Sequence, residues 1–184
     1  MPLIPTIAHQ YIAYRAFCQG DIPPKWCSNL PPSIYTHAQS TYWNVGPFRY
    51  WTLQQLPNIL LAMPVLALLF YGSVLHIRYG LYPRLKGEHP PQGAKDPFFD
   101  LSVTPHAIHA LLLATILLVS SHTQIALRLA SSLPFLYWSA AHLWTSGKQK
   151  AHGKELMAAK WWTGWSLVWG TISVVLWGVF LPPA

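Results

Sequence analysis

The stretch Leu56–Leu75, LPNILLAMPVLALLFYGSVL, decides the fold class because it runs for twenty residues without a charged side chain. At a rise of about 1.5 Å per residue, a helix of this length crosses the roughly 30 Å hydrocarbon core of a bilayer. Pro57 stands in the first turn, where its missing N–H costs little. Pro64 is interior, and a membrane helix tolerates such a proline when neighbours satisfy the freed carbonyl. We therefore predict a transmembrane helix over residues 56–77.

The composition of the whole chain supports a membrane location. Of the 184 residues, 52% are hydrophobic and only 9% are charged, whereas soluble domains carry about 25% charged residues. The chain also holds ten tryptophans and nine tyrosines, and these amphipathic rings gather at bilayer interfaces. A soluble domain of this composition would lack the polar surface that water requires. We expect an all-α integral membrane protein.

Three further segments lack Asp, Glu, Lys and Arg. Residues 101–127 predict a second transmembrane helix, and residues 161–181 predict the final one. Residues 129–147 contain Pro134 and could form a transmembrane or a re-entrant segment; spanning is favoured because it puts both basic loops on one side of the membrane. About four transmembrane helices are expected. Residues 1–15 resemble the end of a truncated membrane helix, so we expect the chain to be a fragment.

The net charge of +7 is distributed as in a membrane protein. Eight of the twelve Lys and Arg residues fall in two connections between apolar runs, residues 78–100 and 148–160. Because basic loops are retained in the cytosol, both connections are predicted to be cytoplasmic. No basic stripe interleaved with aromatic residues is present, which argues against a nucleic-acid partner.

Residues 16–55 are too polar to span a membrane and too aromatic for a plain linker, so we expect a luminal aromatic loop. Cys18 and Cys27 lie in this loop, and the lumen is oxidising. A disulfide across so short a loop stabilises by about 2–3 kcal/mol in the chain-entropy model. We favour this disulfide over the alternative of two free thiols. A redox or zinc motif of the CxxC type is absent from the sequence.

Two motifs follow each other at a specific spacing: Tyr42-Trp43-Asn44-Val45-Gly46 and Gln55-Leu56-Pro57-Asn58. The accompanying residues are Trp26-Cys27, the turn from Pro32 to Tyr35, Gln39, Arg128, Pro134, Tyr137-Trp138, Ala141, His142 and Phe180-Leu181-Pro182. In this combination the sequence resembles the PIG-V family of GPI mannosyltransferases. The likeness covers nearly all of this chain but only the C-terminal portion of the family's length.

The resemblance implies a multi-spanning GT-C-type glycosyltransferase of the endoplasmic-reticulum membrane. Family members transfer the second mannose, in α1,6 linkage, from dolichyl-phosphate-mannose to the GPI-anchor precursor in the ER lumen. The implied partners are these two lipids, the surrounding membrane lipids and a small accessory membrane subunit. No cofactor is implied, because dolichyl-phosphate-mannose is the donor substrate.

The resemblance also implies a luminal carboxylate that acts as general base on the acceptor hydroxyl. In the family the acidic luminal motif lies in an early loop, upstream of anything in this chain. The only acid in the predicted luminal loop is Asp21, in a Gly-Asp-Ile-Pro-Pro turn that matches no catalytic pattern. We therefore expect the catalytic residues upstream and the chain to be inactive alone. The alternative is a non-catalytic membrane subunit or scaffold of a GPI-biosynthetic complex.

Seven residues are candidates for substrate binding. Aromatic rings can stack on sugar faces or anchor the loop at the interface, the amide of an asparagine can bond a hydroxyl, and an arginine can hold a lipid phosphate or snorkel to headgroups. The candidates are Trp26, Gln39, Tyr42, Trp43, Asn44, Arg49 and Arg128. His106 and His109 share a helix face but lack further ligands at matching spacing, so no metal site is expected. His142 receives no role.

Overall fold

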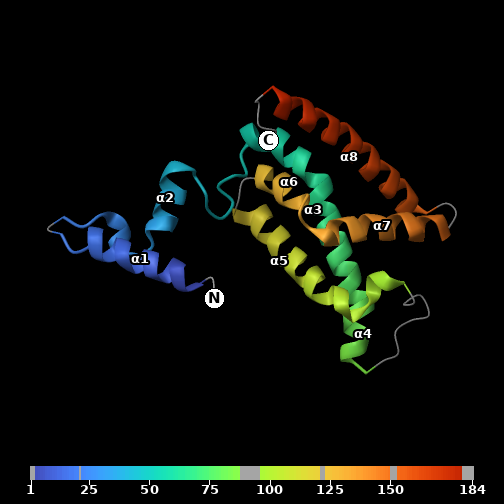
Figure 1. Cartoon of the computed structure of the whole chain (residues 1–184), viewed down its shortest axis with the longest axis horizontal. Helices are drawn as coiled ribbons and strands as arrows, with labels where there is room; N and C mark the ends of the chain where they lie inside the picture. Colours follow the sequence, from blue (N-terminus) through green and yellow to red (C-terminus); the bar gives the residue numbers. More distant parts are fainter. Residues whose placement is uncertain (1–2, 21, 88–95, 121–122, 150–152, 180–184) are drawn as a thin grey trace. The chain divides into compact units, whose positions relative to one another are not determined.

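The computed structural model describes residues 3–20, 22–87, 96–120, 123–149 and 153–179, and within these ranges it contains helices and turns but no strand (Figure 1). The predicted all-α class is therefore confirmed for the described residues. The chain divides into two compact units, Met1–Tyr50 and Trp51–Ala184. The predicted boundaries at residues 1 and 181, and parts of both basic loops, lie outside the described residues.

The first unit contains helix α1, Leu3–Phe17, a 3₁₀ turn over Lys25–Ser28, and helix α2, Ile34–Tyr42. Ser33 caps α2, because its hydroxyl accepts the backbone N–H of Thr36 at 3.2 Å. The side chain of Gln10 in α1 accepts the backbone N–H of Ile34 at 3.1 Å. Residues 16–55, predicted as a loop, thus include a short helix whose first turn is tied to α1.

The second unit is built around helix α3, Leu56–His76, which continues through a π turn, Ile77–Leu81, into α4, Tyr82–Leu85. The helix therefore extends two turns beyond the predicted boundary at residue 77. Pro83 follows directly after the π turn, where the regular ladder of backbone hydrogen bonds is already interrupted. The predicted position of Pro57 in the first turn of α3 is confirmed.

Helices α5, Thr104–Ser120, and α6, Thr123–Ala130, share the region predicted as one helix over 101–127. Helix α5 ends at Ser120 and α6 begins at Thr123, and the two residues between them lie outside the described part of the chain, so the single helix over 101–127 stays a prediction. Helices α7, Pro134–Gln149, and α8, Lys154–Gly178, complete the chain.

Two of the described helical runs, Leu53–Leu85 and Leu101–Ser120, are long and apolar enough to cross a membrane. Helix α8 is 25 residues long, but its tryptophans and glycines lower its mean hydropathy. The spanning of α6–α7 and of α8 therefore stays a prediction.

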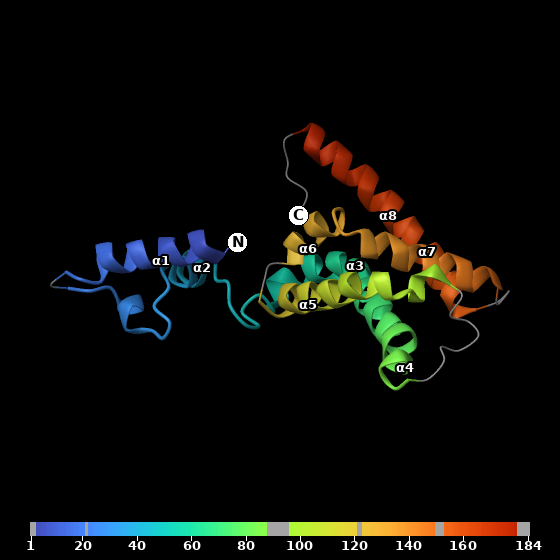
Figure 2. The same cartoon turned by 60° about the horizontal axis from the view of Figure 1, so that its bottom comes forward.

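The core of the second unit lies where α5, α6 and α7 pack on α3 (Figure 1). Small residues permit the closest contacts. A Cβ on Gly72 of α3 would lie 2.8 Å from the Cβ of Ser139 in α7, and a Cβ on Gly147 of α7 would lie 2.6 Å from the backbone nitrogen of Leu156 in α8. Figure 2 shows the C-terminal end of α7 beside the N-terminal end of α8. Backbones that approach this closely leave no room for a side chain.

Candidate functional site

The segment Asp96–Asp100, Asp-Pro-Phe-Phe-Asp, contains one 3₁₀ turn, Pro97–Phe99, and a second 3₁₀ turn, Leu101–Val103, follows it and leads into α5. Asp96 accepts the backbone N–H of Phe98 at 2.9 Å, and Asp100 accepts the backbone N–H of Ser102 at 2.9 Å. Hydrogen bonding by the side chain and backbone of Ser102 lowers the pKa of Asp100. Both carboxylates therefore act as caps for the turn that follows them.

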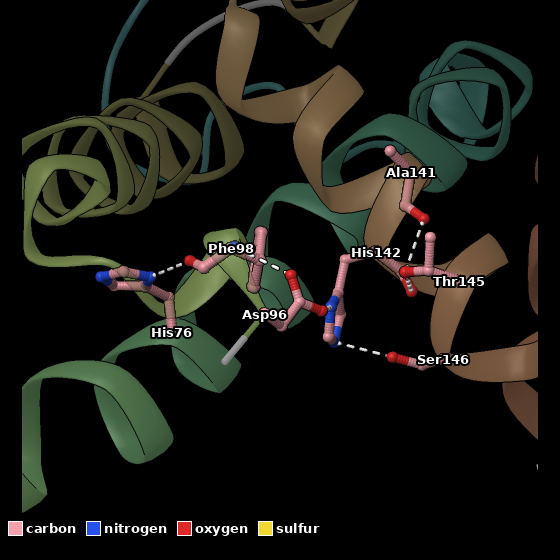
Figure 3. A network of polar contacts seen from close by, with 7 residues as sticks. All are labelled: His76, Asp96, Phe98, Ala141, His142, Thr145 and Ser146. Carbon is pink, nitrogen blue, oxygen red and sulfur yellow. Dashed lines mark hydrogen bonds and ion pairs between the residues drawn. The ribbon is translucent and has the colours of Figure 1, made fainter. Parts of the chain in front are cut away.

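Asp96 also holds His142 of α7, as Figure 3 shows. Its Oδ2 lies 2.8 Å from Nδ1 of His142, while its Oδ1 accepts the Phe98 amide. The ring of Phe98 stacks on His142 with centroids 4.5 Å apart. The exposed fraction is 8% for the His142 side chain and 29% for the Asp96 side chain. This contact fastens the Asp96–Asp100 segment to α7.

A second buried histidine, His76 of α3, fastens the same segment from the other side. Nδ1 of His76 lies 2.8 Å from the carbonyl oxygen of Phe98, and Nε2 lies 2.9 Å from Oγ1 of Thr104. Because a carbonyl can only accept, Nδ1 carries the hydrogen, and Nε2 of the neutral ring accepts from the Thr104 hydroxyl. Arg84 adds a bond of 2.7 Å to the carbonyl of Phe99. The network thereby joins α3, α5 and α7.

The order Ser146–His142–Asp96 has the members of an acyl-transfer triad, with Nε2 of His142 3.3 Å from Oγ of Ser146. Ser146 lies one turn after His142 on the same helix, and the amides around it donate to carbonyls one turn back. They therefore do not form the oxyanion hole that such chemistry needs. We assign this network a structural role.

Of the predicted substrate residues, Trp26 is the one that the structure buries, with 3% of its surface exposed. It lies in the 3₁₀ turn beside Cys27, which is joined to Cys18 in a disulfide with Cα atoms 5.6 Å apart. Tyr42 and Trp43 are exposed, at 78% and 58%. Those two rings, and not Trp26, are accessible for stacking on a ligand within this unit.

The end of α2 gives Asn44 and Gln39 a conformational role. Asn44 has a φ of 50°, in the left-handed region that asparagine tolerates better than most residues. The carbonyl of Gln39 accepts the backbone N–H of Trp43 at 3.3 Å and that of Val45 at 3.0 Å. Asn44 therefore reverses the chain so that Val45 can complete the helix end.

The two predicted phosphate-binding arginines lie in different units. Arg49 is exposed and lies over Gly46, where an added Cβ would come within 3.0 Å of its Cδ. Arg128 is exposed in the last turn of α6, and its carbonyl accepts the hydroxyl of Ser131 at 2.8 Å. The structure therefore groups Arg49, and not Arg128, with the YWNVG motif within one unit.

Sequence reasoning missed the contacts of Asp96, His76 and His142. A usable signal was present, because Asp96-Pro97 has the pattern of a capping residue followed by proline in the first helical position. The histidine partners carried no such signal. The bond between Asp96 and His142 joins residues 46 positions apart.

Residues 2–184 match the sequence profile of the family described as Mannosyltransferase (PIG-V). The chain belongs to the PIG-V family. The resemblance drawn from YWNVG and QLPN is thus confirmed. No solved structure matches the chain.

Curated relatives of this PIG-V chain carry consistent names. It is 35% identical to GPI mannosyltransferase 2 of Cryptococcus neoformans var. neoformans serotype D, over 98% of this chain and 44% of the relative. It is 35% identical to GPI mannosyltransferase 2 of Schizosaccharomyces pombe, over 99% of this chain and 35% of the relative. It is 32% identical to GPI alpha-1,6-mannosyltransferase 2 of Rattus norvegicus, over 76% of this chain and 35% of the relative. The chain thus spans less than half the length of these relatives.

Proposed function

We propose that this chain supplies the C-terminal membrane region of a mannosyltransferase that adds the second mannose of the GPI anchor. The proposed reaction transfers mannose in α1,6 linkage from dolichyl-phosphate-mannose to the GPI precursor in the ER lumen. The observation that carries the proposal is the family match over residues 2–184. The name of the rat relative, GPI alpha-1,6-mannosyltransferase 2, supports the α1,6 linkage.

The chain is proposed to contribute substrate surface rather than the catalytic base. It contains five acidic residues. Asp96 and Asp100 cap turns, and Glu155 lies in the first turn of α8. Asp21 and Glu88 lie outside the described residues. The general base must reach the acceptor hydroxyl, and the resemblance puts the family's acidic luminal motif in an early loop. We therefore place the base in a region of the enzyme that precedes these residues.

The exposed end of α2 is the surface that we propose contacts the sugar or the head of the lipid substrate. Tyr42 and Trp43 offer accessible rings there, and Arg49 offers a guanidinium that suits phosphate oxygens in the same unit. Sugar stacking needs exposed rings, so these two residues are better candidates than Trp26.

The proposed GT-C-type membrane arrangement has four spans: α3, α5, the pair α6–α7, and α8. It places the two basic connections, which contain Lys86 and Lys150, in the cytosol. It places the YWNVG motif in the lumen. Epitope tags near Lys150 and near Trp26 test it by protease treatment of sealed microsomes. We expect cleavage only of the tag near Lys150. Cleavage of the tag near Trp26 would remove the basis of the luminal site.

A chimera tests the activity. In Schizosaccharomyces pombe cells that lack the relative named above, the C-terminal region of that relative is replaced by this chain, and membrane insertion is verified by immunoblot. We expect the chimera to restore addition of the second mannose to radiolabelled GPI precursors, and this chain alone to restore nothing. Restoration by the chain alone contradicts the placement of the base. An inserted chimera that leaves the one-mannose precursor unconverted contradicts the proposed reaction and favours the scaffold alternative.

A further inference from the structure

A cavity of about 640 Å³ lies between α3, α7 and α8. Its walls are apolar and aromatic, with Ala67 and Tyr71 from α3, Leu143 from α7, and Trp161, Trp162 and Trp165 from α8. This volume falls within the range of roughly 300–1,000 Å³ that is typical of small-molecule sites. The packing of the three helices therefore leaves space for a ligand.

A second cavity, of about 670 Å³, adjoins the first along α8. Trp161 and Trp165 line both cavities, and Leu61 of α3 and Ile172 of α8 line the second. Trp161 is 75% exposed. We call the two cavities together the tryptophan groove. Its length along α8, from Lys154 to Ile172, suits an extended chain better than a compact molecule.

One end of the tryptophan groove is basic. Lys154 lines the first cavity and Lys160 the second, and both side chains are exposed. Glu155 also lines the first cavity and offsets the charge of Lys154, so the positive charge that remains in the groove is that of Lys160. Tryptophan beside lysine at the end of an apolar helix is the arrangement found at membrane interfaces.

Trp162 contributes a polar group to the apolar wall. Its indole Nε1 is buried, and it has no hydrogen-bond partner among the described residues. Unsatisfied buried donors are costly and call for an explanation, such as an acceptor supplied by a ligand. An ester carbonyl of a glycerolipid is such an acceptor, and it reaches this buried nitrogen when the indole of Trp162 turns toward the groove.

An acyl chain has little hydrophobic reason to leave the bilayer for this groove, because lipid tails are as apolar as the groove walls. Selective binding must therefore come from the headgroup and the ester region. We propose that the tryptophan groove binds an anionic phospholipid, with one acyl chain along Trp161 and Trp165, an ester carbonyl accepting from Trp162, and the phosphate beside Lys154 and Lys160. This site shares no residue with the surface proposed around Arg49, and it does not depend on the proposed reaction.

Photocrosslinking tests the site directly. The 184-residue chain and the chimera are each placed in lipid nanodiscs that contain phosphatidylserine or phosphatidylcholine with a diazirine on one acyl chain. Crosslinked peptides are then identified by mass spectrometry. We expect labelling of α3 between Leu61 and Tyr71 and of α8 between Trp161 and Ile172, several-fold stronger with phosphatidylserine.

Charge variants supply the decisive comparison. Lys154→Gln and Lys160→Gln are each expected to reduce the preference for phosphatidylserine about fivefold. Lys86→Gln removes the same charge at the end of α4, outside the groove, and is expected to leave the preference unchanged. Trp162→Phe keeps an aromatic ring but removes the donor, and is expected to reduce labelling by both lipids.

Three outcomes overturn the proposal. Equal labelling by the two lipids shows an annular lipid without selectivity. An unchanged preference in both lysine variants removes the headgroup site. Labelling of the groove in the isolated chain but not in the chimera shows that protein, and not lipid, occupies the groove.

Discussion

Asp96 and His142 lie 46 residues apart in sequence and meet with Oδ2 and Nδ1 separated by 2.8 Å. The same carboxylate caps the turn at Phe98 through its other oxygen. One side chain therefore fixes both the local turn and its attachment to α7. Removal of that side chain should release both at once.

Asp96→Ala is expected to lower the free energy of unfolding by about 1–3 kcal/mol, because it leaves the buried ring of His142 without its acceptor and removes the cap. The measurement is the thermal unfolding midpoint of the purified chain in detergent. Asp100→Ala is the matched control, since Asp100 caps Ser102 with the same 2.9 Å geometry at an exposed position. Equal loss in both variants would show that the contact with His142 adds nothing.

Gly72→Ala is expected to destabilise the contact between α3 and α7. The new Cβ would lie 2.8 Å from the Cβ of Ser139, and overpacking of this kind costs about 1–3 kcal/mol. The double variant with Ser139→Gly should recover part of the loss. In contrast, Gly170→Ala, where no heavy atom lies within 4 Å of the added Cβ, should be neutral or stabilising. An unfolding midpoint for Gly72→Ala equal to that of wild type would contradict the packing.

Two substitutions of Asn44 distinguish a conformational role of this residue from a direct contact with substrate. Asn44→Gly keeps access to the left-handed region but removes the amide, whereas Asn44→Ala costs about 1–2 kcal/mol at this φ. We expect the chimera with glycine to retain more mannose transfer to radiolabelled GPI precursors than the chimera with alanine. Equal loss in the two variants would instead favour a direct bond from the Asn44 amide to substrate.

The disulfide between Cys18 and Cys27 predicts the relative stability of three cysteine variants. Because Cys18 and Cys27 pair with each other, Cys18→Ser, Cys27→Ser and the double variant should lose the same stability, about 2–3 kcal/mol in the chain-entropy model. Limited proteolysis of the region before Tyr50 measures that loss. A double variant that is much less stable than either single variant would indicate that the thiols act separately.

Much of the fold could be predicted because it rests on hydropathy. Leu56–Leu75 carries its own signal, since a charge-free run of that length needs no tertiary information. Helix ends depend on neighbours instead. Past residue 77, Arg84 donates to the carbonyl of Phe99, and this contact between residues 15 positions apart is one that no local pattern contains.

The candidate site divides in the same way. Tyr42-Trp43-Asn44 stands in a motif that identifies the family, so the sequence alone singled it out. The burial of Trp26 depends on how its turn packs, and this could not be inferred from residue type. The network around Asp96 and His142 was missed because it is formed by residues that are distant in sequence.

The joint between α6 and α7 has a consequence for the response to bilayer thickness. The hydroxyls of Ser131 and Ser132 donate to the carbonyls of Arg128 and Leu129, each at 2.8 Å, so the chain turns there with those backbone groups satisfied. In the proposed topology, a thinner or thicker membrane can be accommodated by a change of angle at this joint. A helix such as α5, which has no such joint, must tilt as a whole.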